Sequence, residues 1–276
     1  MFKRTALLSL AVVLWNSPAL ALHEAPVKVT AEGSVILGDD STIGQAKAAA
    51  LNNARRAALE KTTGVEVRGS STVYNFQLID DLVVTATKGL IVRENVLENS
   101  CAAKDGQLSC SAKIEAWVAR LHEEKRGDLS VTSIEVHRPD RQEKVTSPVF
   151  QSFDEIHIHA SANQDAYLNI FSVDQNGNIS RLYPNEYSRF EKTAGGKELT
   201  FPDDAQRKAG LKLKVRTPKG IKKSVESVLV VATKDNVTFL NAKDNENPTI
   251  TDLMRELSEL DPSQWASKTA GYEVRE

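Results

Sequence analysis

The chain has 276 residues, a formal net charge of −2 and a hydrophobic share of 41%. That share is ordinary for a globular protein, and the length suffices for one large domain or two of usual size. The mild negative charge argues against a bulk role on nucleic acids or membrane surfaces, so we expect no nucleic-acid partner.

The first 21 residues have the pattern of a secretory signal peptide. Lys3 and Arg4 precede an apolar stretch, Thr5 to Trp15, and Ala19-Leu20-Ala21 is a small-residue cleavage site. The apolar stretch is too short to span a membrane, and no later segment reaches that length. We therefore expect an exported periplasmic protein, cleaved near Ala21 and without a transmembrane segment.

The two cysteines, Cys101 and Cys110, flank Asp105-Gly106, a dipeptide typical of two-residue hairpin turns. Counting outward from this turn places Cys101 opposite Cys110 at a non-hydrogen-bonded position, where Cα atoms approach to ~4.5 Å. A disulfide bond accepts that distance. Because an oxidising compartment favours such bonds, we predict a structural disulfide; the C-x-x-C spacing of redox pairs is absent.

The N-terminal half, residues 22–126, predicts an α+β domain with two helices on a small antiparallel sheet. It opens with a strand expected over 27–37 and interrupted at Gly33. The other elements expected here are a helix over 42–63, a short strand over 65–68, a second helix over 74–88, and strands over 90–97, 96–103 and 108–118.

The first helix of this half has clear start and stop signals. Thr42 and Gln45 fit the capping-box pattern, and Gly64 follows the last helical residue as a C-cap. Arg55 and Arg56 lie on one flank, where we expect solvated charges. The opposite side carries an alanine-rich stripe that allows close approach to a sheet, made of Ile43, Ala46, Ala50, Ala54 and Ala57, with Leu51 and Ala58 beside it.

Two charged segments, 121–127 and 137–144, flank a short strand expected over 131–136. We place the domain boundary in this region and treat residues 127–148 as a linker. A C-terminal domain is then expected over 149–276.

The C-terminal half predicts a β-rich, sandwich-like domain that ends in a helix. Residues 210–216 alternate, with Lys212, Lys214 and Arg216 pointing outward, and the apolar run 225–233 predicts a central strand. The further elements expected are a strand over 155–160, a helix over 251–260 and a last edge strand over 272–275.

Residues 167–183 predict a β-hairpin around Asp174-Gln175-Asn176-Gly177. Two registers are open. If Asn176-Gly177 is a two-residue turn, Phe171 faces Leu182; if Gly177 is the left-handed residue of a three-residue loop, Phe171 faces Arg181. The two registers put opposite faces of the hairpin in the core.

The segment 205–224 contains eight basic residues and no acidic one, which makes it the candidate partner surface. An anionic glycan or an acidic protein patch would fit, and the simpler interpretation is an outward strand face without a ligand. Aromatic residues do not interleave with these charges, which argues against single-stranded nucleic acid. The candidate binding residues are Lys212, Lys214, Arg216, Lys219, Lys222 and Lys223, with Arg207 and Lys208 nearby in the chain.

His157 and His159 lie on one face of an expected strand, as in some zinc sites, which need three or four ligands. The sequence fixes no third ligand, so we interpret them as exposed strand histidines and predict no metal and no cofactor. The hydrolase, metalloprotease and phosphate-loop motifs are also absent, so we predict a protein that is not an enzyme.

Both halves resemble known families. The N-terminal segments EGSVILGDD, AKAAALNNARRAALEKTTG, TKGLIVRENVLEN and KIEAWV resemble the N-terminal domain of the flagellar assembly protein T family, whose members are periplasmic ring components. The C-terminal segments DAYLNIFSVDQNGNISRLYPN, GLKLKV and ESVLVVATKDN, with the closing helix and Trp265, resemble a family of unknown function that recurs in bacterial secreted and envelope-linked proteins. The second resemblance implies a β-rich, sandwich-like module without known catalytic residues.

The leading hypothesis is a non-enzymatic, exported accessory protein of the cell envelope. It would contact envelope or secretion-apparatus proteins during assembly or secretion. The alternative is a module that binds an anionic glycan or peptidoglycan through the basic residues between 207 and 223.

Overall fold

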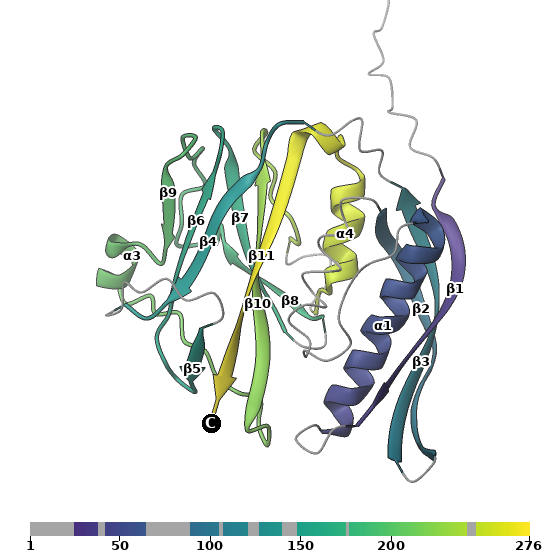
Figure 1. The fold of residues 1–276 in the computed structure, drawn as a ribbon. Helices are drawn as coiled ribbons and strands as arrows, with labels where there is room; N and C mark the ends of the chain where they lie inside the picture. The colour runs from purple at the N-terminus through teal and green to yellow at the C-terminus, as the bar shows by residue number, and fades with distance from the viewer. Residues whose placement is uncertain are drawn as a thin grey trace, which may run out of the picture.

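A computed structural model of the protein describes residues 25–37, 42–64, 89–104, 107–120, 127–139, 148–174, 177–241 and 247–276. These residues form the predicted α+β fold, in which strands predominate and build three sheets (Figure 1). The expected signal peptide, the strand over 65–68 and the helix over 74–88 lie outside the described residues. None of the described helices is long and apolar enough to cross a membrane.

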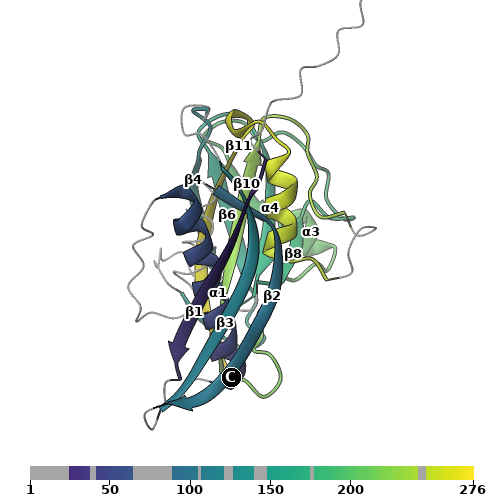
Figure 2. The ribbon, with the colours of Figure 1, turned by 90° about the vertical axis from the view of Figure 1, so that its right-hand side faces the viewer.

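The N-terminal sheet has the strand order β1-β3-β2 and is antiparallel throughout, and Figure 2 looks onto its outer face. Its strands are β1 (Val27–Ile36), β2 (Gly89–Lys104) and β3 (Gln107–Arg120). The strands expected over 90–97 and 96–103 are one continuous strand, because two bulges let β2 keep pairing with β3. The predicted disulfide is confirmed: Cys101 lies opposite Cys110, with their Cα atoms 4.0 Å apart.

Helix α1 (Ile43–Thr63) covers the inner face of this sheet and has the predicted ends. Thr42 and Gln45 exchange the capping-box hydrogen bonds, and Gly64 adopts the left-handed conformation with φ +69°. The alanine stripe packs on the sheet as expected, although Ile43, in the first turn, is 52% exposed. The buried alanines of this stripe are Ala46, Ala50, Ala54 and Ala58.

Gly33 does not interrupt β1, contrary to the expectation from sequence, and instead lies directly under α1. A Cβ atom at Gly33 would stand 2.2 Å from the backbone nitrogen of Ala54 and 2.5 Å from the carbonyl oxygen of Ala50. The missing side chain and the alanine stripe together let helix and strand pack backbone to backbone.

The C-terminal half is a sandwich of two sheets that enclose one hydrophobic core (Figure 1). Ile158 from the smaller sheet and Ile170 and Val230 from the larger one lie fully buried in it. The smaller sheet has the order β4-β6-β9, with β4 (Val131–His137), β6 (His157–Ala162) and β9 (Glu198–Phe201). The larger sheet has the order β5-β11-β10-β7-β8, with β5 (Val149–Gln151), β11 (Trp265–Arg275), β10 (Lys223–Thr233), β7 (Tyr167–Val173) and β8 (Ile179–Tyr183).

Several elements of this half differ from the sequence prediction. The segment 210–216 forms a single bridge, Glu155 to Lys214, and no regular strand, although Val215 is buried and Lys214 exposed as predicted. The closing strand, β11, is longer than expected and lies inside the sheet, because β10 pairs along its whole length and β5 pairs with its other edge. β9 and the short helix α3 (Asp204–Lys208) were missed. β4 lies in the expected linker and pairs with β6; the domain division itself stays a prediction.

The β-hairpin predicted over residues 167–183, formed by β7 and β8, adopts the second of the two open registers. Gly177 has φ +83°, and Phe171 lies opposite Arg181. The Asn178 N–H donates to Asp174 Oδ1 at 2.9 Å, which fixes the loop.

Helix α4 (Ile250–Ser258), followed by the 3-10 turn η2 (Pro262–Gln264), covers the face of the larger sheet that points toward the N-terminal half (Figure 1). Leu253 and Leu257 pack there with Phe171. Leu90 and Val92 of β2 belong to the same cluster, so α4 joins the two halves of the chain through one apolar core.

We expect Gly33→Ala to lower the free energy of unfolding by about 1–3 kcal/mol, because the added methyl group must displace the α1 backbone. Gly44→Ala is the matched control, since the nearest atom to its new Cβ, Thr42 Oγ1, is 3.8 Å away; it should be neutral or slightly stabilising. Urea unfolding of the two variants measures the difference. Equal stabilities would show that helix and strand are not in backbone contact.

Candidate functional site

The two halves meet at a polar junction around Arg55, on the side of α1 that faces away from the N-terminal sheet. Arg55 was expected to be solvated, and that prediction is wrong: the residue is 4% exposed. It belongs to a second buried stripe at helical spacing, made of Ala48, Asn52, Arg55, Leu59 and Thr62. A cavity of about 20 Å³, roughly the space of one water molecule, is lined by residues of both halves, among them Leu59 and Met254 of α4.

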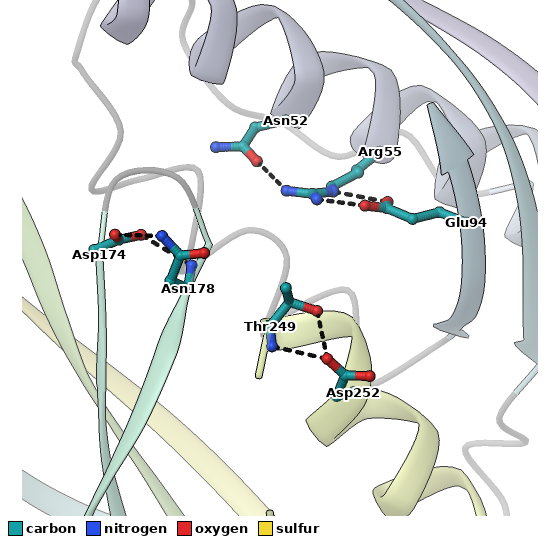
Figure 3. A network of polar contacts seen from close by, with 7 residues as sticks. All are labelled: Asn52, Arg55, Glu94, Asp174, Asn178, Thr249 and Asp252. Carbon is teal, nitrogen blue, oxygen red and sulfur yellow. Dashed lines mark hydrogen bonds and ion pairs between the residues drawn. The ribbon is translucent and has the colours of Figure 1, made fainter. Parts of the chain in front are cut away.

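The Arg55 guanidinium is held by three hydrogen bonds (Figure 3). Nε donates to Glu94 Oε2 at 2.8 Å, Nη2 to Glu94 Oε1 at 2.5 Å, and Nη1 to Asn52 Oδ1 at 2.8 Å. The two ionic side chains are 5% and 14% exposed, so this is a buried, bidentate ion pair that links α1 to β2.

The C-terminal half places two loops against this ion pair (Figure 3). A Cβ atom at Gly177 would lie 3.2 Å from Arg55 Nη1, so the tip of the β7–β8 hairpin contacts the guanidinium. The Ile250 N–H donates to the Gly177 carbonyl at 2.9 Å and thereby ties the start of α4 to the same tip. Asp252 accepts hydrogen bonds from the N–H and the hydroxyl of Thr249.

The polar contacts of this junction hold the elements that meet there in place. Of the residues drawn in Figure 3, Arg55 supplies a permanent cation, and Glu94 and Asn52 use their oxygens to hold it. The remaining side chains form hydrogen bonds within their own loops, Asn178 with Asp174 and Thr249 with Asp252. The arrangement therefore orients the two halves relative to each other.

The smaller sheet gathers three histidines on its outer face. His137 lies opposite His157, and its ring stacks on that of His159 with the centroids 4.6 Å apart. His159 Nδ1 is 2.6 Å from Glu198 Oε1. Among the described residues, no group of three or more His, Cys, Asp or Glu side chains is placed to hold a metal ion.

His157 is buried, at 5% exposure, where an exposed strand histidine was expected. Burial lowers the pKa of its imidazole below the usual 6.5, and the nearby charge of Arg207 and the neighbouring His137 lower this pKa further. His157 is therefore neutral at neutral pH.

The structure divides the predicted basic segment into paired and unpaired charges. Arg207 pairs with Asp204, Lys212 Nζ lies 3.6 Å from Glu155, and Lys223 Nζ lies 2.7 Å from Glu273. Of the six candidate binding residues, the others are exposed and make no ion pair with a described residue: Lys214, Arg216, Lys219 and Lys222.

Sequence reasoning missed an exposed aromatic residue beside these charges. Phe153 is 68% exposed and has φ +73°, at the third position of a turn closed by the Asp154 N–H and the Gln151 carbonyl. Turns of this kind usually place glycine there, because a left-handed backbone costs other residues roughly 1–2 kcal/mol. Ser152 and Asp154 signal a turn in the sequence, but no pattern places the ring.

A comparison with protein families describes part of this half. Residues 149–236 match a family model described as a domain of unknown function, DUF4384. The match runs from β5 past the end of β10 and includes Phe153 and the basic segment. It identifies a domain of unknown function in the C-terminal half and is silent on the N-terminal half. No curated protein matches the chain.

We expect Arg55→Met to lower the free energy of unfolding by about 3–5 kcal/mol, because it leaves Glu94 buried without its counter-charge. The double variant Arg55→Met with Glu94→Met removes both charges and should recover most of this loss. Arg275→Met is the control, since that arginine pairs with Glu273 but is 55% exposed, and it should cost about 1 kcal/mol or less. Additive losses in the double variant would contradict a buried pair.

Proposed function

We propose that the protein is a non-enzymatic accessory protein of the bacterial cell envelope, exported to the periplasm, which acts by contact with other envelope or secretion proteins. The observation that carries this proposal is the disulfide-closed β2–β3 hairpin, whose outer strand β2 has an unpaired edge among the described strands and exposed aliphatic side chains.

The two bulges of β2 support this interpretation, because one packs inside the protein and the other is exposed to solvent. Each bulge adds one residue to β2 that has no pairing partner on β3: Val92 in the first and Leu97 in the second. Val92 packs against the α4 core, so the first bulge serves a contact within the chain. Leu97 is 55% exposed and its neighbour Val96 is 48% exposed.

The edge of β2 is open within the described part of the chain, because β2 is the last strand of its sheet. An open edge with exposed aliphatic residues can pair with another chain, although proteins limit such pairing with charge, proline or bulges, and β2 has two bulges and the exposed charges of Arg93 and Glu98. The first bulge places Val92 against the α4 core. By analogy, the second bulge would place Leu97 against a partner protein.

Two further features support the compartment and the partner class. A disulfide bond such as Cys101–Cys110 is typical of proteins that fold in an oxidising compartment. The expected signal peptide also indicates export to such a compartment. The resemblance of the N-terminal half to the N-terminal domain of the flagellar assembly protein T family adds an assembly role at the periplasmic side.

The proposal predicts that a photo-crosslinking residue at position 97 captures an envelope protein in intact cells. Val96→Lys, next to the crosslinking position, should weaken that capture by about tenfold or more, as expected for a central contact residue, without lowering the melting temperature. Ile36→Lys is the matched control, because Ile36 is 60% exposed on β1, the other edge strand, and should leave capture unchanged. Recovery of the protein only as a free monomer would contradict the proposal.

A further inference from the structure

The turn that carries Phe153 is rigidly built. The Gln151 N–H donates to Asp154 Oδ2 at 2.7 Å, and the Phe153 N–H donates to the Val215 carbonyl at 2.7 Å. Arg138 forms an ion pair with Asp154, and its guanidinium lies over the Phe150 ring. The backbone of an exposed aromatic residue is thus held in place, in a conformation that favours glycine.

The segment paired with the Phe153 turn carries cationic residues. The bridge between Glu155 and Lys214 aligns residues 153–156 with the antiparallel segment 213–216, which brings Arg216 beside Phe153. Lys214 and Arg216 are exposed and make no ion pair with a described residue.

Two acidic groups of this surface are engaged by cations, and the exposed Glu276 lies beside Lys222, since its N–H donates to the Lys222 carbonyl. Arg138 pairs with Asp154, and Lys212 lies 3.6 Å from Glu155. Lys219 and Lys222 add further exposed charge as the chain continues toward β10. The surface is therefore locally positive, although the chain as a whole has a net charge of −2.

This surface combines one exposed aromatic residue with several exposed cations. That composition indicates which kind of anionic partner the surface fits. Protein interfaces have cores depleted of lysine and bury about 1,000 Å² or more, which a single ring among lysines does not resemble. A bilayer surface fits better, because a ring can enter the boundary of the acyl chains while lysine and arginine head groups stay with the lipid phosphates.

We propose that Phe153, with Lys212, Lys214 and Arg216, is a contact site for the surface of an anionic phospholipid bilayer. The site lies in the part of the chain that matches the domain of unknown function, and nothing in the match assigns it. The inference goes beyond the proposed function and is separate from it, since the β2 edge and the Phe153 turn belong to different sheets.

Co-sedimentation with vesicles tests this site. The protein is used from Leu22 onward, because the apolar segment before it would itself bind lipid. It should sediment with vesicles of phosphatidylcholine and phosphatidylglycerol at low salt, but not with phosphatidylcholine alone, and salt should weaken the binding. Phe153→Gly should lower the vesicle-bound partition coefficient by about tenfold, as expected when one aromatic side chain no longer leaves water.

The variants keep the test interpretable. Phe153→Gly and Phe153→Asn both suit the left-handed backbone, so the melting temperature should stay equal or rise. Tyr187→Ala is the matched control, because Tyr187 is an aromatic residue of similar exposure, 70%, outside this turn, and its loss should not alter binding. Charge reversal at Lys212, Lys214 and Arg216 should abolish sedimentation.

Three results would overturn the proposal. The first is no sedimentation with phosphatidylglycerol vesicles, and the second is binding that Phe153→Gly leaves unchanged. The third is tight binding to an acidic polysaccharide that Phe153→Gly does not weaken, which would make the surface a site for anionic glycans. Capture from position 97 is measured separately, so loss of one activity leaves the other intact.

Discussion

Helix α1 is buried on two sides, and the rest of the structure depends on that constraint. On one side alanines and Gly33 bring its backbone against the N-terminal sheet. On the other side Arg55, a residue that normally stays in water, is enclosed and neutralised by Glu94. A buried cation of this kind is tolerated only with good pairing geometry, so the position of β2 relative to α1 is fixed by the ion pair as well as by apolar packing.

The same constraint determines how the C-terminal half attaches. The hairpin tip at Gly177 rests on the guanidinium, and its carbonyl accepts a hydrogen bond from Ile250 at the start of α4. Helix α4 then fills the space between the larger sheet and β2 with one apolar cluster. The two proposed contact surfaces, the β2 edge and the Phe153 turn, therefore have a fixed position relative to each other. This suits a protein that holds two partners at a fixed distance and orientation.

Local signals in the sequence predicted the elements that local physics determines. The capping box at Thr42, the left-handed Gly64 and the hairpin register at Cys101–Cys110 were all read correctly, because backbone hydrogen bonds and turn conformation decide them within a few residues. The β7–β8 register needed the structure to choose between two turns that the sequence allows equally.

Features that depend on distant residues were not predicted. Arg55 and His157 are buried by elements far along the chain, and only a helical stripe of mixed polarity, Asn52, Arg55 and Thr62, marked the second face of α1. β11 lies inside the sheet because β5, which is more than 100 residues earlier in the chain, forms a parallel pair with its outer edge. The left-handed Phe153 contradicts local preference outright, so no local pattern in the sequence predicted its conformation.

The central claim is that the two halves form one unit through the Arg55 junction and α4. Calorimetric unfolding of the protein with its disulfide intact tests this most directly. The account predicts a single transition whose calorimetric and van't Hoff enthalpies agree. Two separate transitions, one for each half, would contradict it.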